Sequence, residues 1–327
     1  MPMPDLSIII VNWNSAAYLR KCLASIYQHT RETSFELVVV DNASTEDCND
    51  MLTHDFPDVR LIAAETNLGF ARANNLGASA TSGRILLFLN PDTEVSSDAL
   101  SDMAVWLQAH PGSGAVGAPL LNSDGSLQDS CVQSFPTILN QILDCALLRR
   151  YFPNSTLWGT RSLYSSKDAA ATVDAISGAC FMVRRAVFEA VGGFTESYFM
   201  YAEDLDLSYK IHRAGFEVVC LSSCEVLHYG GTSSGKQSTH FAAVLQREAI
   251  AHFLAMSRGR IYSAAYRATT GIASLVRLGL VLCSLPFASE ARGRHRAISI
   301  LAKWLAIFTW SIGLRSSLRL RGSQTHA

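Results

Sequence analysis

Strand-like and helix-like stretches alternate over the first sixty residues of this chain, and this alternation constrains its fold more than any other feature. Residues 6–11, 35–40 and 59–63 are rich in β-branched and other apolar side chains, as in buried strands. Ser44 with Asp47 resembles a capping box for the second of the helices between them. Because parallel strands need crossover connections, the pattern predicts an α/β fold with a Rossmann-like, mostly parallel central sheet flanked by helices.

A fourth buried strand is predicted at residues 86–89, where an apolar run stops abruptly at Asn90, Pro91 and Asp92. Pro91 lacks the N–H group that a sheet ladder needs, so the strand must end there. Asp92 is therefore expected at the carboxyl end of a strand, where open α/β sheets bind their ligands. A carboxylate in that crevice can hold a divalent metal against a diphosphate, although a plain turn explains the same residues equally well.

Further acidic residues are expected at the same edge of the sheet. Asp41 ends the second strand, and Glu203 with Asp204 opens a helix that continues to about residue 214. Clustered carboxylates repel one another unless a cation or a bound ligand compensates their charge. Several acids at successive strand ends therefore favour a binding or catalytic site.

Two common phosphate-binding patterns are absent from the sequence. No GxGxxG follows the first strand, and no GxxxxGK[ST] occurs anywhere, so neither a dinucleotide-binding fingerprint nor a P-loop is supported. Residues 120–170 are less regular, with a hairpin turn expected at residues 122–125 and no chemical role assigned. Strand character resumes at residues 175–183.

Charge divides the chain into two parts. Residues 1–257 carry 16 Lys and Arg against 27 Asp and Glu, whereas residues 258–327 carry 11 against the single Glu290. Two apolar stretches in the second part, residues 272–287 and 297–314, are shorter than the roughly 20 residues that a transmembrane helix needs. We therefore expect one α/β domain followed by a basic, apolar helical tail on an anionic membrane surface. A short membrane hairpin and ordinary globular packing are the alternatives for the tail.

The remaining composition bears on location and partners. The eight cysteines have no repeated CxxC spacing, which is typical of reduced, mostly buried thiols in a cytosolic protein. The N-terminus has no basic segment before its short apolar run, so a signal peptide is not expected. We predict a cytoplasmic protein, peripheral on the inner face of the cell membrane, with no nucleic-acid partner; a homo-oligomer remains open.

Several ordered blocks of this sequence resemble the family 2 glycosyltransferases of the GT-A fold, closest to bacterial rhamnosyltransferase-like members. The blocks are residues 7–14, 39–44, 67–75, 89–93, 177–179 and 203–207, with His228 behind them. The resemblance covers about residues 5–231 and leaves out the tail. It implies a GT-A domain over residues 1–257, with residues 258–327 as a C-terminal helical appendage.

The resemblance also implies roles for residues in the donor-binding half of the site. Asp41, with Asn12 beside it, would read the pyrimidine ring of a nucleotide sugar, and Arg72 would face the diphosphate or the sugar. Taken alone, Arg72 also fits a plain surface charge. The full nucleotide-sugar-binding set implied in this way is Asn12, Asp41, Asn42, Asn67, Arg72 and Asn90.

The catalytic half follows from the same resemblance. Asp92 matches the last acid of the DxD metal motif, and His228 matches a second ligand of Mg²⁺ or Mn²⁺. Asp204 matches the catalytic base, helped by Glu203. The first acid of DxD is Asn90 here, which leaves one fewer negative charge at the metal. Taken alone, His228 would also fit a structural histidine.

The implied activity is an inverting transfer of a sugar from a nucleotide donor to a glycan or lipid-linked acceptor in cell-surface polysaccharide synthesis. Such a transfer needs a base for the acceptor hydroxyl, a cation on the leaving diphosphate, and alignment of both around the anomeric carbon. The favoured donor is dTDP-rhamnose, from which rhamnose would be transferred. A UDP-hexose or UDP-galactofuranose transferase and a non-catalytic nucleotide-sugar-binding scaffold are the alternatives.

Overall fold

A computed structural model describes residues 4–128, 130–143, 151–152, 155, 169–230, 239–284 and 291–314 of the chain. The chain forms two compact units, one of Met1–Phe135 with Pro153–Ser233 and the other of Pro136–Phe152 with Ser234–Ala327. This division lies elsewhere than the expected boundary at residue 257. The reason is that helix α9 (Thr239–Arg258) packs with α10 (Arg260–Ser284) and α11 (Ala291–Ser311).

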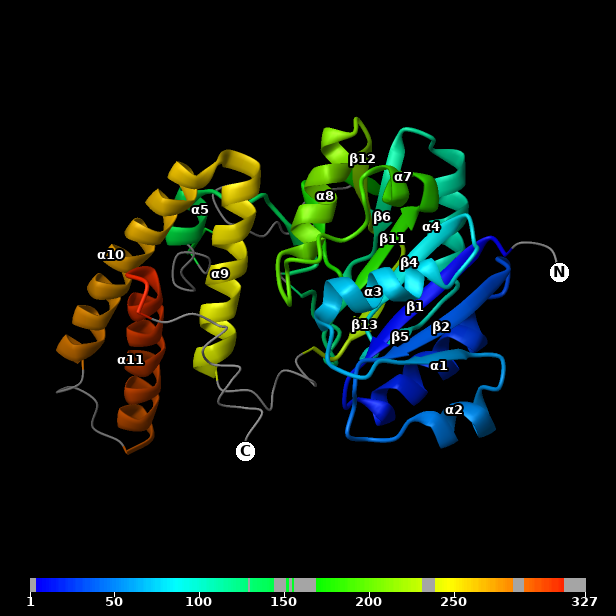
Figure 1. The fold of residues 1–327 in the computed structure, drawn as a ribbon, viewed down its shortest axis with the longest axis horizontal. Helices are drawn as coiled ribbons and strands as arrows, with labels where there is room; N and C mark the ends of the chain where they lie inside the picture. The colour runs from blue at the N-terminus through cyan, green and yellow to red at the C-terminus, as the bar shows by residue number, and fades with distance from the viewer. Residues whose placement is uncertain are drawn as a thin grey trace. The chain divides into compact units, whose positions relative to one another are not determined.

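The first unit is built on a mixed sheet in which most neighbouring strands run parallel (Figure 1). In spatial order, its described strands are β3 (Arg60–Ala63), β2 (Phe35–Asp41), β1 (Leu6–Asn12), β4 (Ile85–Leu89), β11 (Cys180–Arg184), β6 (Ser113–Gly117), β12 (Glu217–Leu221) and β9 (Ala170–Thr172). Strand β11 runs antiparallel to both β4 and β6, and β9 runs antiparallel to β12. The predicted α/β fold with a mostly parallel central sheet is confirmed.

Helices cover the central strands on both faces. All side chains of β4 are buried, and in β1 only Val11 is partly exposed. Burial on both faces explains why these strands are continuous apolar runs in the sequence. The helices that flank the sheet are α1 (Ala16–His29), α2 (Asn49–Asp55), α3 (Gly69–Ser79), α4 (Ala99–Ala109), α7 (Arg185–Ala190) and α8 (Glu203–Arg213).

Two expectations from the sequence are wrong. The strand expected at 175–183 is divided into β10 (Ala175–Ile176), which pairs with β8 (Val132–Gln133), and β11. A turn separates the two, because the N–H group of Cys180 donates to the carbonyl of Ser177 at 3.3 Å. The helix expected after Ser44 begins only at Asn49, because the Ser44 hydroxyl donates to Asp41 Oδ1 at 2.6 Å instead of capping it.

A small three-stranded sheet lies beside the carboxyl end of β4. Its strands are β5 (Thr93–Val95), β13 (Val226–His228) and β7 (Leu120–Leu121). Strand β13 pairs antiparallel with β5, so that His228 lies opposite Thr93. The turn expected at residues 122–125 is confirmed, with Gly125 at a φ of +78° that favours glycine. This sheet brings the chain after β4 next to the chain around residue 228.

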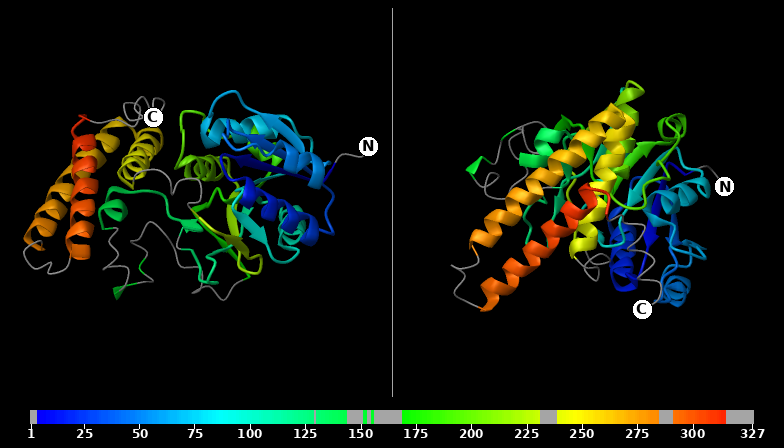
Figure 2. Two further views of the ribbon diagram at one scale, coloured as in Figure 1. Left: turned by 90° about the horizontal axis from the view of Figure 1, so that it is seen from below. Right: turned by 60° about the vertical axis from the view of Figure 1, so that its left-hand side comes forward.

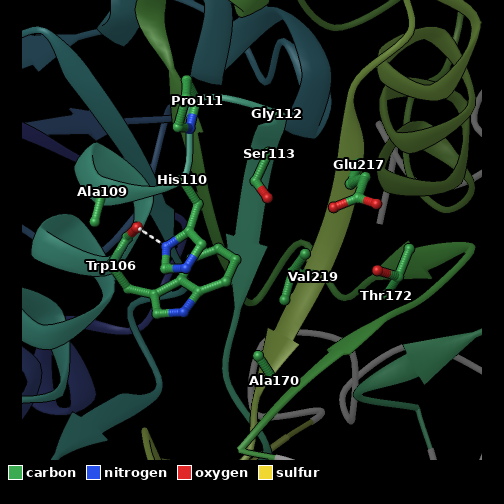
Figure 3. Close-up of a pocket in the computed structure, with 10 residues that line it drawn as sticks. All are labelled: Trp106, Ala109, His110, Pro111, Gly112, Ser113, Ala170, Thr172, Glu217 and Val219. Carbon is green, nitrogen blue, oxygen red and sulfur yellow. Dashed lines mark hydrogen bonds between the residues drawn. The ribbon is translucent and has the colours of Figure 1, made fainter.

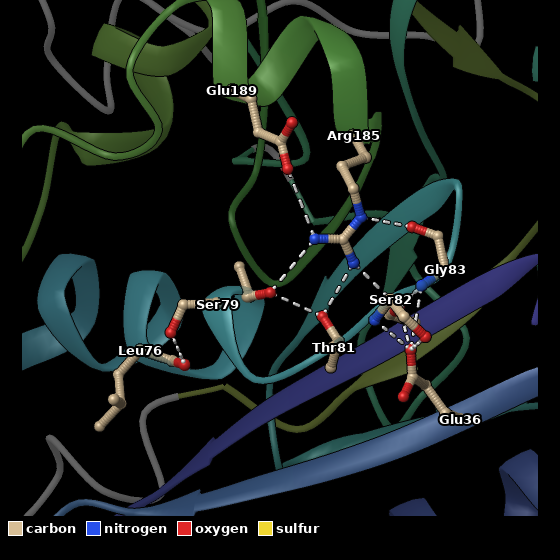
Figure 4. A network of polar contacts seen from close by, with 10 residues as sticks. Glu36, Leu76, Ser79, Thr81, Ser82, Gly83, Arg185 and Glu189 are labelled. Carbon is tan, nitrogen blue, oxygen red and sulfur yellow. Dashed lines mark hydrogen bonds and ion pairs between the residues drawn. The ribbon is translucent and has the colours of Figure 1, made fainter. Parts of the chain in front are cut away.

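A polar network fixes the opposite, amino-terminal end of the central strands (Figure 4). Arg185 donates from Nε to the carbonyl of Gly83 at 2.5 Å and from Nη2 to Thr81 Oγ1 at 3.0 Å. Glu36 Oε1 accepts the N–H groups of Ser82 and Gly83 at 2.6 and 3.0 Å. These contacts tie the loop before β4 to β2 and to Arg185, at the end of the strand opposite Asp92.

The second unit is helical. Helices α9, α10 and α11 pack on one another, and α5 (Ile138–Leu143) packs on α10 (Figure 2). Arg277 of α10 lies over the ring of Trp304 in α11, 4.3 Å from its centroid. Within the described residues, no helix combines the length and the apolarity needed to cross a bilayer. The basic segment at residues 315–321 lies outside the described residues.

Candidate active site

Three neighbouring parallel strands end at one edge of the central sheet. Asn12 at the end of β1 lies opposite Asp41 at the end of β2. Ile10 of β1 lies opposite Leu89, the last residue of β4, and Asp92 follows three residues later. Strand geometry alone therefore gathers the amide and the two carboxylates along one edge.

Asn12 and Asp41 form a hydrogen-bonded corner of this edge. Asn12 Nδ2 donates to Asp41 Oδ1 at 3.0 Å, and the Ser44 N–H group donates to Asp41 Oδ2 at 3.1 Å. These contacts fix the orientation of the Asp41 carboxylate while leaving it partly exposed. Asn12 Oδ1 is buried and has no hydrogen-bond partner within the described part of the chain.

Asn42 and Asn67 hold the loop that leads into α3. Asn42 Nδ2 donates to Asn67 Oδ1 at 3.1 Å, and Asn42 Oδ1 accepts the N–H group of Leu68 at 2.8 Å. Asn67 Oδ1 also accepts the N–H group of Gly69 at 2.9 Å. Both amides are thus used to fix the backbone beside Asp41, where the sequence predicted contacts with a nucleotide sugar.

Arg72 lies on α3, with 57% of its side chain exposed. Its Nε atom is 3.7 Å from Glu196 Oε2, and both partners are equally exposed. Such a surface pair contributes little to stability and leaves the guanidinium able to exchange partners.

Asp92, Asn90 and His228 come together across the small sheet. Asp92 Oδ1 is 3.3 Å from His228 Nε2, and Asn90 Nδ2 is 3.4 Å from the same nitrogen. The N–H group of Tyr229 donates to the carbonyl of Asp92 at 2.9 Å, which ties the two segments together. Asp92 is only 6% exposed. The residues that the sequence named as metal ligands are thus neighbours, although 136 positions separate them in the chain.

Glu203 and Asp204 open helix α8 on the other side of the site. Asp204 Oδ2 accepts the N–H group of Gly178 at 3.0 Å and Gln133 Nε2 at 3.4 Å. Asp204 is partly exposed, whereas Glu203 is buried and its Oε2 has no partner among the described residues. Gln133 carries no sequence signal for this role, because a lone glutamine at the end of a two-residue strand is unremarkable.

The turn at residues 177–179 connects the two halves of the site. Asn90 donates its N–H group to the carbonyl of Ala179 at 3.0 Å, and the adjacent Gly178 donates to Asp204. The metal side and the carboxylate side are therefore one backbone residue apart along this turn. The ring of Phe70, at the start of α3, lies against this turn, since a Cβ atom added at Gly178 would be 3.3 Å from Phe70 Cζ.

The two carboxyl groups of α8 differ in their tendency to ionise. Burial, and after it the charge of Asp204, raise the pKa of Glu203 to about 8. Burial also raises the pKa of Asp204, but hydrogen bonds from the N–H groups of Gly178 and Leu205 oppose that rise. Near neutral pH, Glu203 therefore holds a proton while Asp204 is the better candidate for the charged acceptor of a proton.

Asp92 and His228 fit a divalent metal, although they do not form a complete cage. In the described ranges, no group of three or more His, Cys, Asp or Glu side chains could hold a metal ion. Mg²⁺ in nucleotide enzymes is commonly held by one or two carboxylates together with substrate phosphates. One carboxylate and one imidazole that face each other at 3.3 Å suit a metal that a diphosphate also coordinates.

A separate pocket of about 350 Å³ lies at the other edge of the sheet (Figure 3). Ser113 and Glu217, the first residues of β6 and β12, line it, and Trp106 stacks on His110 with ring centroids 4.0 Å apart. Because it lies at the amino ends of these strands, this pocket is distinct from the site around Asp92 and Asp204.

Comparisons with known proteins show the family of this chain. The model of the family described as Glycosyl transferase family 2 matches residues 7–192 of the chain. The N-acetylglucosaminyl-diphospho-decaprenol L-rhamnosyltransferase of Mycobacterium tuberculosis is 32% identical over 253 residues, covering 73% of this chain and 80% of that protein. Rhamnosyltransferase WbbL of Escherichia coli is 25% identical over 229 residues, covering 68% and 82%.

Solved structures show the same fold. The mannosyltransferase PcManGT from Pyrobaculum calidifontis, in complex with GDP-Man and Mn²⁺, matches 96% of this chain and 88% of its own, with a TM-score of 0.58 and 20% identity. GalNAc-T7 with UDP, GalNAc and Mn²⁺ matches 95% of this chain and 56% of its own, with a TM-score of 0.57 and 14% identity. At these identities the likeness concerns the GT-A fold alone.

Proposed function

The chain belongs to glycosyl transferase family 2, and from this premise we propose that it is an inverting, metal-dependent enzyme that transfers rhamnose from dTDP-rhamnose. We propose a glycan or a lipid-linked acceptor, in cell-surface polysaccharide synthesis. One observation carries the proposal: the Asp92–His228 pair and the Asp204 carboxylate flank the same turn at residues 177–179. The names of the two similar rhamnosyltransferases support the choice of sugar.

Asp204 acts as the general base in this proposal. Its partly exposed carboxylate is held by the N–H group of Gly178, so it can accept the proton of an acceptor hydroxyl without first reorienting. Glu203 stays protonated beside it and leaves one negative charge, rather than two, at the start of α8. A single displacement with the base on one side of the sugar and the leaving group on the other inverts the anomeric carbon.

Asp92 and His228 would hold Mg²⁺ or Mn²⁺ on the leaving-group side. Bound there, the metal neutralises charge that develops on the departing diphosphate. Asn90 replaces a carboxylate at this position, so the protein supplies one fewer negative charge, and the diphosphate contributes more of the binding. Asn12 and Asp41 would read the pyrimidine, with Arg72 toward the diphosphate or the sugar.

A panel of dTDP-, UDP- and GDP-sugars tests the donor by thermal shift in the presence of Mg²⁺ or Mn²⁺. A ligand present at about 100 times its Kd adds about 2.7 kcal/mol to the free energy of unfolding of the protein that binds it. We expect dTDP-rhamnose to give the largest shift and GDP-sugars to give little. Protection by GDP equal to that by dTDP or UDP would overturn the pyrimidine role of Asp41.

A UDP-hexose or UDP-galactofuranose transferase on the same scaffold is the nearest alternative, and the same panel distinguishes it. A non-catalytic nucleotide-sugar-binding scaffold is the alternative of a different class. The positioned Asp204 argues against a scaffold, because a binding protein does not need a base. Slow metal-dependent hydrolysis of the donor separates an enzyme from a scaffold, since a scaffold would bind the donor without hydrolysing it.

We propose an anionic membrane surface as the partner of the helical unit, and a peripheral location on the cytoplasmic face of the cell membrane. One face of α10 carries exposed apolar side chains at helical spacing: Ile272, Leu275, Val276 and Leu280, each more than half exposed. Residues 258–327 also carry 11 basic residues and one acidic residue. An apolar stripe with basic surroundings is typical of helices that lie in an anionic interface.

Vesicle sedimentation tests this surface. Replacing Leu275, Val276 and Leu280 together by Gln should reduce binding to anionic vesicles by roughly tenfold or more, because each buried CH₂ group contributes about 0.8 kcal/mol. Val105→Gln, an equally apolar and exposed position on α4, serves as the control. Unchanged sedimentation of the triple variant, with donor binding intact in both, would refute the membrane role.

A further inference from the structure

The side chain of Gln128 holds His228 at two points. Gln128 Nε2 donates to the main-chain carbonyl of His228 at 2.6 Å, and Gln128 Oε1 is 2.8 Å from His228 Nδ1. The single side-chain amide of Gln128 thus contacts both the backbone and the ring of His228. The 2.8 Å contact to the ring is shorter than those of Asp92 and Asn90, which lie at 3.3 and 3.4 Å from His228 Nε2.

The two contacts determine which ring nitrogen carries the proton. Because the amide nitrogen of Gln128 faces a carbonyl, its oxygen must face the ring, and an oxygen there can only accept. His228 Nδ1 must therefore be the N–H donor. In a neutral imidazole this leaves a lone pair on Nε2, the nitrogen that points toward Asp92. A lone pair opposite a carboxylate oxygen favours a cation between them.

Gln128 is itself fixed by the backbone around it. Its N–H group donates to the carbonyl of Leu120 at 2.8 Å, and its carbonyl accepts the N–H group of Cys131 at 3.2 Å. Leu120 belongs to β7, which runs parallel to β13, the strand that ends in His228. The glutamine therefore sits on the far side of the same small sheet that sets the distance between His228 and Asp92.

We propose that Gln128 is a positioning residue that fixes His228 as the Nδ1–H tautomer and so makes Nε2 available to a divalent metal. This inference rests on the proposed function, because it takes Asp92 and His228 to be the metal ligands. Outer partners of this kind set the tautomer and the orientation of a ligating histidine, and their loss typically costs about 10–100-fold in metal affinity. The irregular segment after β7 thereby acquires a role.

Mn²⁺ binding in the presence of saturating dTDP tests the proposal without relying on turnover. The free ion is measured by electron paramagnetic resonance in a titration of the full-length protein. Gln128→Met keeps the length of the side chain but removes the acceptor, and we expect Mn²⁺ affinity to fall about 10–100-fold. Gln108→Met, on the exposed side of α4, is the matched control and should leave the affinity unchanged.

Nuclear magnetic resonance of ¹⁵N-histidine-labelled protein reports the tautomer directly. At pH 8 without metal, long-range ¹H–¹⁵N spectra should show a protonated Nδ1 and a bare Nε2 for His228, assigned by the loss of its signals in His228→Gln. The Gln128→Met protein should show a mixture of the two tautomers. A folded Gln128→Met protein with the wild-type tautomer and wild-type Mn²⁺ affinity would overturn the inference.

The outcomes for Gln128 and for the proposed function remain distinguishable. If wild-type protein binds no Mn²⁺ with dTDP while His228 is the Nδ1–H tautomer, the metal role fails and the assignment of the tautomer stands. If wild-type protein binds Mn²⁺ but His228 is protonated on Nε2, the positioning role of Gln128 is wrong and the metal role survives. A drop in affinity for Gln128→Met and none for Gln108→Met supports both.

Discussion

Asp204→Asn should separate the chemical role of this carboxylate from its structural one. Both of its oxygens accept backbone N–H groups: Gly178 donates to Oδ2 at 3.0 Å and Leu205 to Oδ1 at 2.8 Å. An asparagine has only one oxygen, so in either orientation its NH₂ group must face an N–H group. Leaving one such donor unpaired costs about 1–3 kcal/mol, and the partial exposure of residue 204 points to the lower part of that range.

The loss in turnover should be much larger than this structural cost. Removal of a general base typically lowers kcat by about 10²–10⁴-fold, and we expect a decrease of that order which added metal does not relieve. Donor affinity should change by no more than about threefold, because Asp204 lies on the side of the site away from Asp92 and His228. The melting temperature should fall by roughly 2–4 °C for each kcal/mol lost.

The assay compares kcat, dTDP affinity and melting temperature across a Mn²⁺ titration, with Asp206→Asn as the control. Asp206 lies two residues further along α8, accepts a hydrogen bond from the Thr195 hydroxyl and forms an ion pair with Lys210, so its loss also weakens the helix. Asp206→Asn should lower the melting temperature yet keep turnover within about threefold. An Asp204→Asn enzyme with near-normal turnover would refute the base assignment and redirect attention to Glu203.

Three further substitutions test other parts of the molecule. Asp92→Asn should weaken Mn²⁺ binding and diphosphate affinity together, and part of its lost turnover should return at high Mn²⁺; no rescue at any concentration would contradict the ligand role. Burial raises the pKa of Glu203 from 4.5 to about 8. The folded protein therefore holds the Glu203 proton more tightly than the unfolded chain does, and the free energy of unfolding falls as the pH rises between those two values. Glu203→Gln should flatten this fall in urea titrations at a series of pH values, and an unchanged slope would show that Glu203 is ionised in the folded state. Arg185→Met leaves the carbonyl of Gly83 without its donor, whereas the carbonyl of Ala78 keeps the Thr81 hydroxyl at 2.8 Å, so the change should cost about 1–3 kcal/mol in thermal unfolding while dTDP affinity stays normal; an unaltered melting temperature would contradict the network of Figure 4.

The fold could be predicted because its signals are local. Strands buried on both faces, such as β1 and β4, read as continuous apolar runs, and each is followed by a helix or a turn. The antiparallel insertion of β11 between β4 and β6 was not predicted. A five-residue strand with four buried side chains carries no information about its neighbours or their direction. Family resemblance, rather than strand pattern, was also needed to pair Asp92 with His228.

The polar contacts around the site could not be predicted for a related reason. Ser44 has a capping pattern, but Asp41 lies close enough in the folded chain to take its hydroxyl, and this competition is invisible in the sequence. Gln128 and Gln133 belong to a segment without a recognisable motif. A glutamine can donate or accept, and only the atoms that face it decide which. The residues that orient a site therefore leave weaker sequence signals than the residues that perform its chemistry.

The backbone directly before α8 is strained, and this strain bears on where the first two carboxylates of the helix lie. Tyr201 and Ala202 have φ angles of +73° and +63°, and neither is glycine. Each left-handed residue costs roughly 1–2 kcal/mol, so the pair is expensive for a turn that any glycine would relieve. The compensation is local: the carbonyl of Ala202 accepts the first hydrogen bond of α8 from Asp206 at 2.9 Å, and Glu203 follows directly into the buried side of the helix. The turn therefore starts the helix abruptly, which buries one acid and leaves the next, Asp204, against Gly178 at the edge of the site.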